Sequence, residues 1–492
     1  MDCLLLGHPV SELPRRIPGD GLFSSAAYER NFALVHTCAR GGLPAAATQG
    51  PRPGPLGVLH TPGLARSPSQ PESLRFLAAR AAMRGRQVRF LTRDEILVLD
   101  DVAALFIRDE TTPGNHTPAF AARAEALGIP VVDSSLSIAI CGDKALQGEL
   151  FAAMGLPCPT TRLLHADNVD AVVADLGFPF VLKQTDGAWS FAVWRIDSAE
   201  ELAARLPALL HNRLFVVAQR WTPSPFDWRV AVLDGELLFA ARYHMVPSHW
   251  QVAQWQGDRV VACGRTEGVP LRALPPEIAA LALRATSRLG RGFFGVDLKE
   301  TVSGPVLIEV NENTDIDVNQ EDGAEGAAVW ERLLDTLLGP APADAVHDFT
   351  AREADVPALA AASAMTFGTE ALSRRGFLAP MRAGTAVVVG LRSDAGIVGH
   401  AQVHLHRRTL RAYVNEVLVS AELRGRGFGE ALMVAAERAA RAAGMRTLTA
   451  HVRAGNARSL GIMLRSGLSI VARLPGWYSG PEDALYLRKR LH

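Results

Sequence analysis

Cysteine and long apolar runs are both scarce in this chain of 492 residues. The cysteines are odd in number, lie far apart and form no CxxC pair, which argues against a disulfide framework or a zinc site. No apolar run reaches the ~18 residues that a membrane span needs, and the first residues, MDCLLLGHPVSEL, lack the basic start of a secretion signal. We therefore expect a cytoplasmic protein in a reducing compartment, without a membrane partner. The five cysteines are Cys3, Cys38, Cys141, Cys158 and Cys263.

An excess of charge of either sign is also absent, because Lys+Arg and Asp+Glu both number 51. The basic residues are spread along the chain, so the sequence predicts no nucleic-acid partner and leaves small acidic substrates open. Only Lys144, Lys183, Lys299 and Lys489 are lysine, so the other 47 of the 51 basic residues are arginine. Where arginine supplies generic surface charge, a remaining lysine is a candidate for a site that needs a compact ammonium on a flexible stem.

The helix and strand patterns predict a multidomain protein of α/β and α+β class. Residues 1–75 are rich in turn formers and show no recognisable chemistry, whereas amphipathic helices and short strands alternate after residue 76. Helices and antiparallel hairpins follow, and the run GPAPADAVHD near 339–348 is typical of a linker. The expected domains are 1–140 (N-terminal α/β segment), 141–340 (α+β core) and 346–492 (third domain).

Two oxygen-bearing side chains in the run LIEVNEN are spaced for one face of a strand. Because side chains alternate along a strand, Glu309 and Asn311 project to the same face, and Asp297 in the partner strand FFGVDLKE can join them. Two carboxylates and an amide oxygen suit a hard cation such as Mg²⁺ that is shared with substrate phosphates. A single acidic residue on a strand is more often solvated or ion-paired, so the metal hypothesis rests on the spacing D-x11-E-x-N.

These residues belong to an ordered set that resembles the motifs of ATP-grasp ligases. Two of the four lysines fill the two lysine positions, and the order of the remaining motifs is the same. Within that superfamily, the similarity over about residues 76–340 is greatest to the RimK-like branch, the glutamate-adding ligases and their relatives. The ordered elements are Lys144, Lys183, the QRW run Gln219–Trp221, the FDWRV run Phe226–Val230, Asp297, Glu309 and Asn311.

The resemblance implies ATP and Mg²⁺ as cofactors and a role for each matching residue. The γ-phosphoryl group would move to a substrate carboxylate, and an amine would attack the resulting acylphosphate. Guanidinium groups would brace the anionic species formed on the way. The implied roles are phosphate binding for Lys144 and Lys183, an adenine hinge for Gln219, Arg220 and Trp221, a ribose contact for Asp227, metal binding for Asp297, Glu309 and Asn311, and acylphosphate bracing for Arg229 and Arg242.

Two positions depart from the RimK-like pattern. The run His249–Gln251 stands where those ligases often carry an arginine after an aromatic residue, which leaves the contact with the substrate carboxylate unassigned. Thr314 replaces the usual proline after the last asparagine, a change expected to alter only a turn. The run that contains Arg108, Asp109, Glu110 and His116 is either part of the site or a surface loop, and the sequence does not decide between them.

The segment Arg424–Gly429 fits the pattern R-x-x-G-x-G between a strand and a helix. The free N–H groups at a helix N-terminus bind a pyrophosphate, and glycines let the phosphate approach the backbone. A Rossmann fingerprint would need G-x-G-x-x-G and an acidic residue at the end of the next strand, but this turn is led by arginine and the strand RTLTAHV ends without an acidic residue.

Residues 346–492 resemble the GNAT acetyltransferases, since the helix NARSLGIMLRSGL follows the turn and the ending GWYSGPEDALYL is similar to members that acetylate α-amino groups. The resemblance implies acetyl-CoA, with its pantetheine arm beside the strand Glu416–Val419. Glu416 is either the group that deprotonates the attacking ammonium through water or an ordinary strand carboxylate. Met463 falls where the family tyrosine commonly protonates the thiolate, so Tyr478 or a water would substitute. The implied cofactor-binding residues are Val417, Val419, Arg424, Gly425, Arg426, Gly427, Gly429 and Asn456.

The sequence thus predicts a bifunctional enzyme that ligates an amine, such as an amino acid or short peptide, to a small-molecule carboxylate and acetylates the substrate or product. Two alternatives stay open, a ligase that modifies a carboxylate of a protein target and a sensor of nucleotide and acetyl-CoA whose catalysis has decayed. The oligomeric state does not follow from the sequence.

Overall fold

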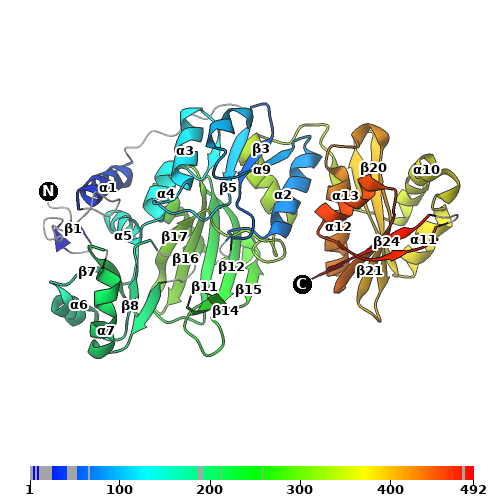
Figure 1. Ribbon diagram of the computed structural model, residues 1–492. Helices are drawn as coiled ribbons and strands as arrows, with labels where there is room; N and C mark the ends of the chain where they lie inside the picture. Colours follow the sequence, from blue (N-terminus) through cyan, green and yellow to red (C-terminus); the bar gives the residue numbers. More distant parts are fainter. Residues whose placement is uncertain are drawn as a thin grey trace. The chain divides into compact units, whose positions relative to one another are not determined.

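The computed structural model describes residues 4–5, 8–9, 25–41, 52–64, 67–186, 192–211, 213–257, 259–478 and 482–491. The chain folds into two compact units (Figure 1), one of residues 1–70 and 89–339 and one of residues 71–88 and 340–492. The first unit ends at Gly339. No helix in the described part of the chain combines the length and the apolar character needed to cross a membrane. Cys3 lies outside the described residues, and Cys38, Cys141, Cys158 and Cys263 are free thiols.

The first unit contains a small parallel sheet with the strand order β4-β3-β5-β6. All four residues of β3 and of β5 are buried, and their strands read as continuous apolar runs because both faces of the sheet are covered. Phe120 of α3 and Ile138 of α4 belong to the core beneath it. The elements up to this sheet are β1 (Leu4–Leu5), β2 (His8–Pro9), α1 (Ser25–Ala39), β3 (Leu56–Leu59), β4 (Val88–Leu91), the 3-10 helix η2 (Ile96–Asp101), β5 (Ala104–Ile107), α3 (Thr117–Ala126), β6 (Val131–Val132) and α4 (Ser135–Cys141).

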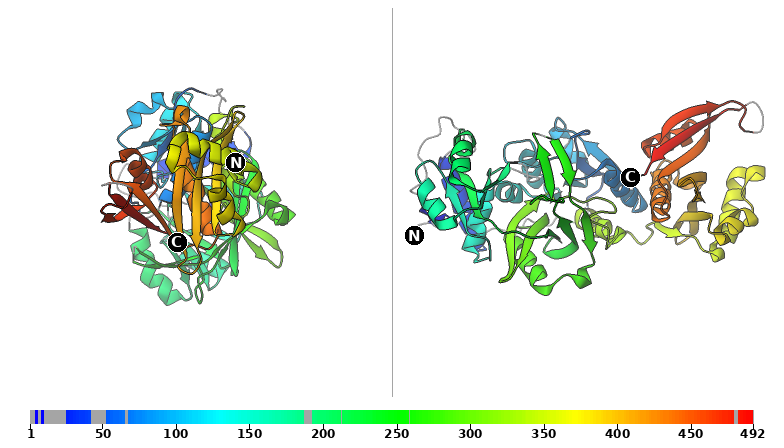
Figure 2. Two further views of the ribbon diagram at one scale, coloured as in Figure 1. Left: turned by 90° about the vertical axis from the view of Figure 1, so that its right-hand side faces the viewer. Right: turned by 90° about the horizontal axis from the view of Figure 1, so that it is seen from below.

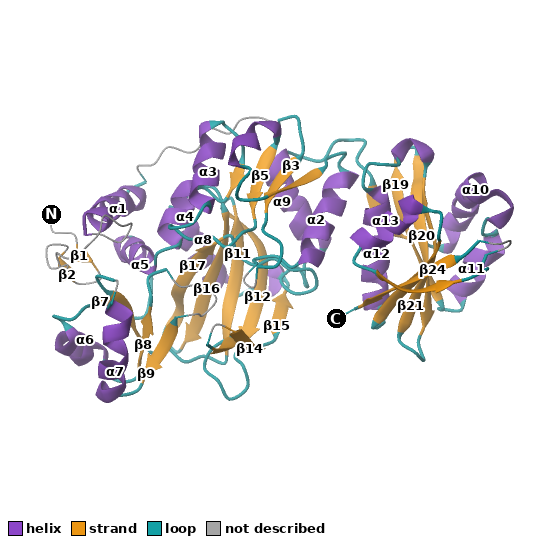
Figure 3. Ribbon diagram, viewed as in Figure 1, coloured by secondary structure: helices purple, strands orange, loops and turns teal. Residues whose placement is uncertain are grey.

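Two larger antiparallel sheets follow in the first unit (Figure 3), with the orders β7-β10-β8-β9 and β15-β12-β11-β16-β17. Helices α6 and α7 contribute to the core of the smaller sheet, and α8 packs on β11, β16 and β17 of the larger one. The pairs β1-β2 and β13-β14 form two-stranded antiparallel sheets. The elements are α5 (Lys144–Ala153), β7 (Thr161–Leu164), α6 (Val169–Leu176), β8 (Phe180–Lys183), β9 (Val193–Ile196), α7 (Ala199–Leu210), β10 (Val216–Arg220), β11 (Phe226–Leu233), β12 (Glu236–His244), β13 (Ala253–Gln256), β14 (Arg259–Cys263), β15 (Thr266–Val269), η3 (Leu271–Ala273), α8 (Pro276–Thr286), β16 (Phe293–Thr301), β17 (Gly304–Glu312) and α9 (Ala327–Leu338).

The second unit is built on a seven-stranded sheet with the order β18-β19-β20-β21-β22-β24-β23. Helices α12 and α13 cover one face, and α10 and α11 lie on the other (Figure 2). Its elements are α2 (Pro71–Met83), β18 (His347–Thr350), η4 (Glu353–Asp355), α10 (Val356–Phe367), η5 (Gly368–Glu370), α11 (Arg374–Arg382), β19 (Ala386–Ser393), β20 (Gly396–His406), β21 (Arg411–Val419), η6 (Ala421–Leu423), α12 (Phe428–Ala442), β22 (Thr447–Arg453), α13 (Ala457–Arg465), β23 (Ser469–Leu474) and β24 (Ala484–Arg490).

Helix α2 follows β3 and precedes β4 in the chain, yet it packs on α12 in the second unit. Ala79 and Met83 of α2 are buried in the same core as α12. At one end of the helix, Arg441 lies 2.8 Å from the carboxylate of Glu72, and at the other end the amide of Val346 donates to the carbonyl of Met83 at 2.7 Å. Because α2 has no place in the predicted domain 346–492, this packing is a feature that the sequence patterns do not predict.

Two candidate active sites

A cavity of about 450 Å³ in the first unit is lined by strands of both antiparallel sheets. Nearly all of the residues implied for ATP and Mg²⁺ meet there. Those that line the cavity are Lys144, Lys183, Gln219, Arg220, Trp221, Asp227, Arg229, Asp297, Glu309 and Asn311.

Two lysines face this cavity from neighbouring elements. Lys144 is the first residue of α5, and Asp143 caps that helix by accepting hydrogen bonds from the amides of its first turn. The Nζ of Lys144 lies 3.6 Å from Oε2 of Glu309. Lys183, the last residue of β8, is only 8 % exposed, and burial lowers its pKa to about 8, although Glu309 opposes this shift. Both ammonium groups are therefore placed to hold anionic phosphates.

The lowered pKa of Lys183, together with the phosphate-binding role that the resemblance implies for it, predicts that ATP binding depends on pH. Below pH 8 the ammonium is charged, whereas above it the free protein must first take up a proton to attract phosphate. We expect the dissociation constant of Mg-ATP to rise by up to about tenfold per pH unit above pH 8, because each unit of pH requires 1.36 kcal/mol more for that proton. Calorimetric titration between pH 6.5 and 9 checks this, with Lys183→Arg as the control, whose pH dependence should disappear. Equal slopes for the two proteins would contradict it.

The predicted hinge lies on β10, at the edge of the same cavity. Gln219 is buried, and its side-chain amide donates to the hydroxyl of Thr161 at 3.1 Å. The ring of Trp221 packs against the ring of Trp250 with 5.1 Å between centroids. Trp250 and Gln251 both line the cavity, so the run that departs from the RimK-like pattern faces the proposed site.

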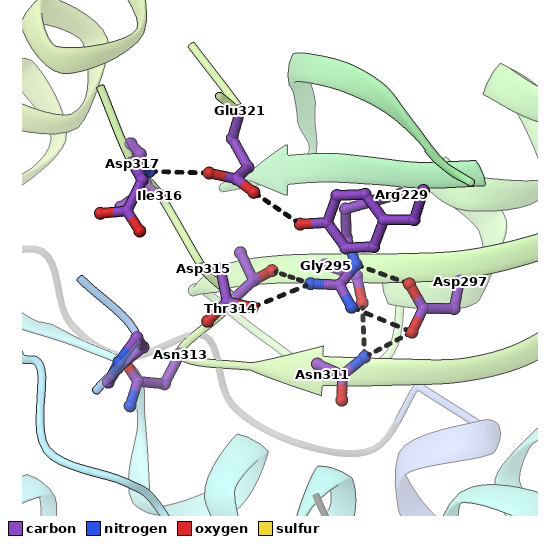
Figure 4. A network of polar contacts seen from close by, with 12 residues as sticks. Arg229, Gly295, Asp297, Asn311, Asn313, Thr314, Asp315, Ile316, Asp317 and Glu321 are labelled. Atoms are coloured by element: carbon purple, nitrogen blue, oxygen red, sulfur yellow. Dashed lines mark hydrogen bonds and ion pairs between the residues drawn. The ribbon is translucent and has the colours of Figure 1, made fainter. Parts of the chain in front are cut away.

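Three antiparallel strands place Arg229, Asp297 and Glu309 in one row, because Arg229 pairs with Asp297 and Asp297 pairs with Glu309. Figure 4 shows the polar network around this row. The guanidinium of Arg229 donates to Oδ1 of Asp297 at 2.5 Å and to Oδ2 at 3.1 Å. The amide of Asn311 also donates to Oδ2 of Asp297, at 3.0 Å. The period-2 spacing of Glu309 and Asn311 therefore does bring both to the face of Asp297.

The donor set of this row fits a magnesium ion bound together with phosphates. Asp297, Glu309 and Asn311 supply two carboxylates and one amide oxygen, which is the chemistry that Mg²⁺ prefers. Burial would raise the pKa of Glu309, but Lys144 and Lys183 outweigh it and lower the pKa, so the carboxylate is ionised. Among the described residues, no group of three or more His, Cys, Asp and Glu could hold a metal alone. The amide and the phosphates would have to complete the coordination.

The loop after β17 is anchored by a buried arginine from the parallel sheet. Arg108 is 0 % exposed and donates to Oδ1 of Asn313 at 2.8 Å and to the carbonyl of Thr314 at 3.1 Å. Its neighbour Asp109 is equally buried and accepts from the amide of Thr61 at 2.5 Å. Arg108 and Asp109 therefore do not lie on an exposed surface loop, and Arg108 anchors the chain that follows β17.

Close packing at this loop requires a glycine in β16. A Cβ atom on Gly295 would lie 2.1 Å from Oγ1 of Thr314 and 2.9 Å from Cδ of Arg229. Any larger residue would displace the hydrogen bond of 2.9 Å from Arg229 to Thr314. Thr314 thus contributes a hydroxyl to the network.

Carboxylates line the end of the cavity beyond Arg229. Tyr243 stacks on the guanidinium of Arg229, 4.9 Å from its ring centroid, and donates to Oε1 of Glu321 at 2.8 Å. Burial raises the pKa of Asp315 to about 7, although Arg229 opposes the shift. Asp317 also lines this end. The end of the cavity is consequently rich in acidic groups around one buried guanidinium.

Arg242 does not line this cavity, contrary to the role that the resemblance implies. It pairs with Trp228 and stacks on Phe226 and Trp228, with 5.0 and 4.7 Å to the ring centroids. A β-bulge between Ala231 and Val232 shifts the register of the hairpin by one residue. Residues that pair directly project to the same face of a sheet, so Arg242 shares the face of Trp228. A one-residue shift of register would place it on the opposite face.

The sequence interpretation missed Lys299, a third lysine that lines the cavity. Its Nζ forms an ion pair with Asp227, the residue implied for the ribose, and donates to the hydroxyl of Ser224 at 2.7 Å. Two signals could have revealed it, since it is one of only four lysines and stands two residues after Asp297, on the same face of β16.

In the second unit, strands β21 and β22 separate part of the way along. They pair in parallel only from Arg411 with Thr447 to Val414 with Ala450, although both strands continue beyond. Asn415 is the extra residue of a β-bulge between β20 and β21, since Gln402 faces Glu416 while the next residue faces Val414. Glu416, Val417 and Val419 therefore line a strand edge that is left unpaired by β22, beside which an extended cofactor arm could lie.

The glycine-rich turn has the conformation that its composition predicts. Gly425 and Gly427 have φ of 83° and 90°, and Gly427 caps helix α12 at its N-terminus. Such a turn presents backbone N–H groups at the positive end of a helix. Arg424 donates from Nε to the carbonyl of Val419 at 3.0 Å, which ties the turn to the end of β21. Arg426 is exposed beside it.

Other implied cofactor residues have structural partners. A Cβ on Gly429 would lie 2.7 Å from Cδ1 of Ile462, so this glycine allows α12 and α13 to approach closely. Asn456 caps α13 by accepting from the amide of Ser459 at 3.0 Å. Met463 is only 5 % exposed and belongs to the hydrophobic core, which removes it from any proton transfer. The Tyr478 ring lies under Arg453, with 4.2 Å between centroid and guanidinium carbon, and burial raises the pKa of its hydroxyl.

Comparisons with known proteins match two separate regions of the chain. Residues 141–330 match the family model described as a RimK-like ATP-grasp domain, and residues 361–468 match the model of the acetyltransferase (GNAT) family.

Curated relatives match the first of these regions. A D-alanine--D-alanine ligase of Desulforudis audaxviator is 31% identical over 201 residues, which cover 38% of this chain and 63% of that protein. A probable alpha-L-glutamate ligase of Parasynechococcus marenigrum is 25% identical over 247 residues, with 49% and 51% covered. The chain thus spans between 51% and 63% of the length of these two relatives. The crystal structure of a RimK domain ATP-grasp protein from Sphaerobacter thermophilus aligns with a TM-score of 0.45 at 21% identity, over 58% of this chain and 100% of that one.

Proposed function

Because the chain contains a RimK-like ATP-grasp domain and a GNAT acetyltransferase domain, we propose that it is a bifunctional enzyme. The first activity joins an amine to a carboxylate with ATP, and the second acetylates an amine of the substrate or product. The fold and the two families agree with the sequence prediction, which is confirmed at that level. The observation that carries the ligase proposal is the row Arg229, Asp297 and Glu309 in one cavity with two lysines.

The cavity residues support an ADP-forming reaction. Lys144 and Lys183 would hold the phosphates of ATP, and Asp297, Glu309 and Asn311 would hold Mg²⁺, which supplies charge neutralisation for phosphoryl transfer. Arg229, fixed by Asp297 and Thr314, would orient the acylphosphate as the amine attacks its carbonyl carbon and phosphate leaves.

The acidic end of the cavity supports an amine substrate beside Arg229, since an ammonium ion is attracted by Asp315, Asp317 and Glu321 before it loses its proton. Amino acids and short peptides carry such a group. A carboxylate on a protein target is the alternative substrate.

The second unit supports acetyl transfer from acetyl-CoA. The turn from Arg424 to Gly427 would bind the pyrophosphate, and the unpaired edge of β21 from Glu416 to Val419 would accompany the pantetheine arm. We assign the ligase to residues 141–340 with the preceding segment 1–140, and the transferase to residues 346–492 together with α2. Both cosubstrates are cytoplasmic metabolites, which supports a cytoplasmic location.

The identity of the nucleotide product tests the ligase proposal. We expect ADP and phosphate, because the γ-phosphoryl group is the one transferred, and a mass-spectrometric screen of carboxylate and amine pairs with Mg-ATP, with and without acetyl-CoA, measures it. Release of AMP and pyrophosphate would refute the assignment.

Met463 favours one competing function, a sensor that binds acetyl-CoA without turnover, because its thioether cannot protonate a thiolate. Tight binding of acetyl-CoA without thiol release from any amine in the same screen would favour the sensor.

A further inference from the structure

The carboxylate of Glu416 is held from two sides by buried groups that the sequence motifs do not include. Oε1 lies 2.6 Å from Nε2 of His400, which stands on the neighbouring strand β20. Oε2 accepts from the hydroxyl of Ser363 on α10 at 3.1 Å. The hydroxyl of Ser363 in turn accepts from the amide of Leu372 at 2.9 Å. Glu416 is thus oriented by groups from the sheet and from the helix above it.

Glu416 lies on β21 close to the point where the pairing with β22 ends. It is the second residue beyond Val414, where the pairing of β21 with β22 ends, and so it stands at the start of the unpaired edge. Its side chain keeps 8 % of its surface exposed, while the side chain of His400 has 0 %. The carboxylate therefore has limited access to a ligand in the opening between the strands, and the imidazole has none.

The hydrogen bonds indicate which nitrogen of His400 carries the proton. An ionised carboxylate only accepts, so a bond between Nε2 and Oε1 requires the proton on Nε2. In the described part of the chain, Nδ1 is buried and has no hydrogen-bond partner. His400 therefore carries a proton on Nε2 and donates it to the carboxylate.

We propose that His400 is a positioning residue of the acetyl transfer, which fixes the carboxylate of Glu416 by donating from Nε2 to Oε1. This inference rests on the proposed acetyltransferase function. In the reaction, a proton passes from the ammonium of the acceptor through a water to Oε2 of Glu416, and the amine nitrogen forms its bond to the acetyl carbon. The bond between that carbon and sulfur breaks, and the thiolate takes a proton from Tyr478 or water. The nitrogen then loses its second proton, which restores that donor, and the proton held by Glu416 passes to solvent.

Variants of the full-length chain test the proposal. His400→Leu removes the donor, and we expect the kcat of thiol release from acetyl-CoA, with a panel of Xaa-Ala dipeptides as acceptors, to fall about tenfold or more. The loss in kcat should not exceed the roughly 10²- to 10⁴-fold that a general base contributes in total. The calorimetric dissociation constant of acetyl-CoA should not change. His400→Gln places an amide donor at a similar reach and should restore most of the rate.

A histidine on the same strand and face provides the matched control. His404 stands four residues after His400 and lies 3.2 Å from the side-chain oxygen of Gln402, without a contact to Glu416. His404→Leu should leave kcat within about twofold, because it removes no hydrogen bond from the carboxylate. Equal losses in the His400→Leu and His404→Leu variants would show a general effect on the sheet and overturn the proposal.

A spectroscopic measurement does not depend on turnover. Long-range ¹H–¹⁵N correlation of the full-length chain labelled at histidine should show His400 with a proton on Nε2, assigned by its absence from His400→Gln. A ring protonated on Nδ1 alone would overturn the proposal even if the His400→Leu variant failed to fold. Absence of thiol release by the unsubstituted chain would instead refute the acetyltransferase function itself.

Discussion

Replacing Asp297 by asparagine is expected to lower the turnover of ATP to ADP by at least about 10²- to 10³-fold. A loss of this size is typical when one group that stabilises developing charge is removed. The substitution removes one of two carboxylates available to the metal and the anion that fixes Arg229 at 2.5 Å. Asparagine keeps the shape of the side chain and can still accept from Arg229. ADP release under saturating Mg-ATP measures the effect. Binding of acetyl-CoA should be unchanged, because its predicted site lies in the other unit.

The matched control is a second carboxylate on the same strand. Glu300 is exposed and accepts from Nε1 of Trp228 at 2.9 Å, and it does not line the cavity. Glu300→Gln keeps this hydrogen bond and should leave ligation within about twofold. If Glu300→Gln lost as much activity as Asp297→Asn, the defect would be one of folding, and the metal assignment would have no support.

Gly427→Asp is expected to weaken the binding of acetyl-CoA by about 100-fold or more, because a carboxylate would occupy the anion site at the N-terminus of α12. The residue has a φ of 90°, which side chains rarely adopt, and a Cβ there would lie 3.1 Å from Cβ of Ala82. Calorimetric titration with acetyl-CoA measures the loss. ADP formation should stay within about twofold, because the variant leaves the first unit unaltered.

The other end of the same helix offers a control for backbone strain. Gly444 has a φ of 78°, similar to that of Gly427, and a Cβ there would meet no atom within 4 Å. Gly444→Asp should therefore destabilise the unit to a similar extent through its backbone while leaving the affinity for acetyl-CoA intact. A loss of affinity in both variants would mean that strain, not the anion site, governs binding.

Local patterns account for the parts of the site that the sequence predicts. Glu309 and Asn311 share a face because the strand period is two, and Gly425 and Gly427 adopt positive φ because glycine alone does so without strain. The hairpin of β11 and β12 turns at Asp234-Gly235, a dipeptide that favours such turns, with φ of 49° and 83° at the two residues. Each of these features depends on residues a few positions apart.

Local sequence patterns do not predict features that depend on the register between paired strands. In the hairpin of β11 and β12, the single extra residue opposite Ala231 and Val232 decides that Arg242 pairs with Trp228. Without the bulge, Arg242 would lie opposite Asp227 and face the cavity. The bulge at Asn415 similarly sets the face of Glu416. The residue types in these strands do not predict either bulge. Only the observed strand pairing therefore shows to which face of the sheet each side chain projects.

Contacts between distant segments are also invisible in one sequence. Arg108 reaches Asn313, 205 residues away, and His400 finds Glu416 on another strand. Burial turns these polar groups into fixed parts of the sites, since a buried donor without its partner is costly. The rarity of lysine could have identified Lys299 as a site residue. The sequence does not show, however, that Lys299 forms an ion pair with Asp227.

Helix α2 limits how far the two activities can be treated as interchangeable modules. A gene fragment that begins at residue 346 would omit Ala79 and Met83 and uncover the apolar face of α12 that they bury. A ligase fragment that ends at residue 340 would retain α2 without the surface on which it packs. A single recombination event in the linker would therefore not exchange the whole second unit for another domain. An engineered exchange would have to replace residues 71–88 together with residues 340–492.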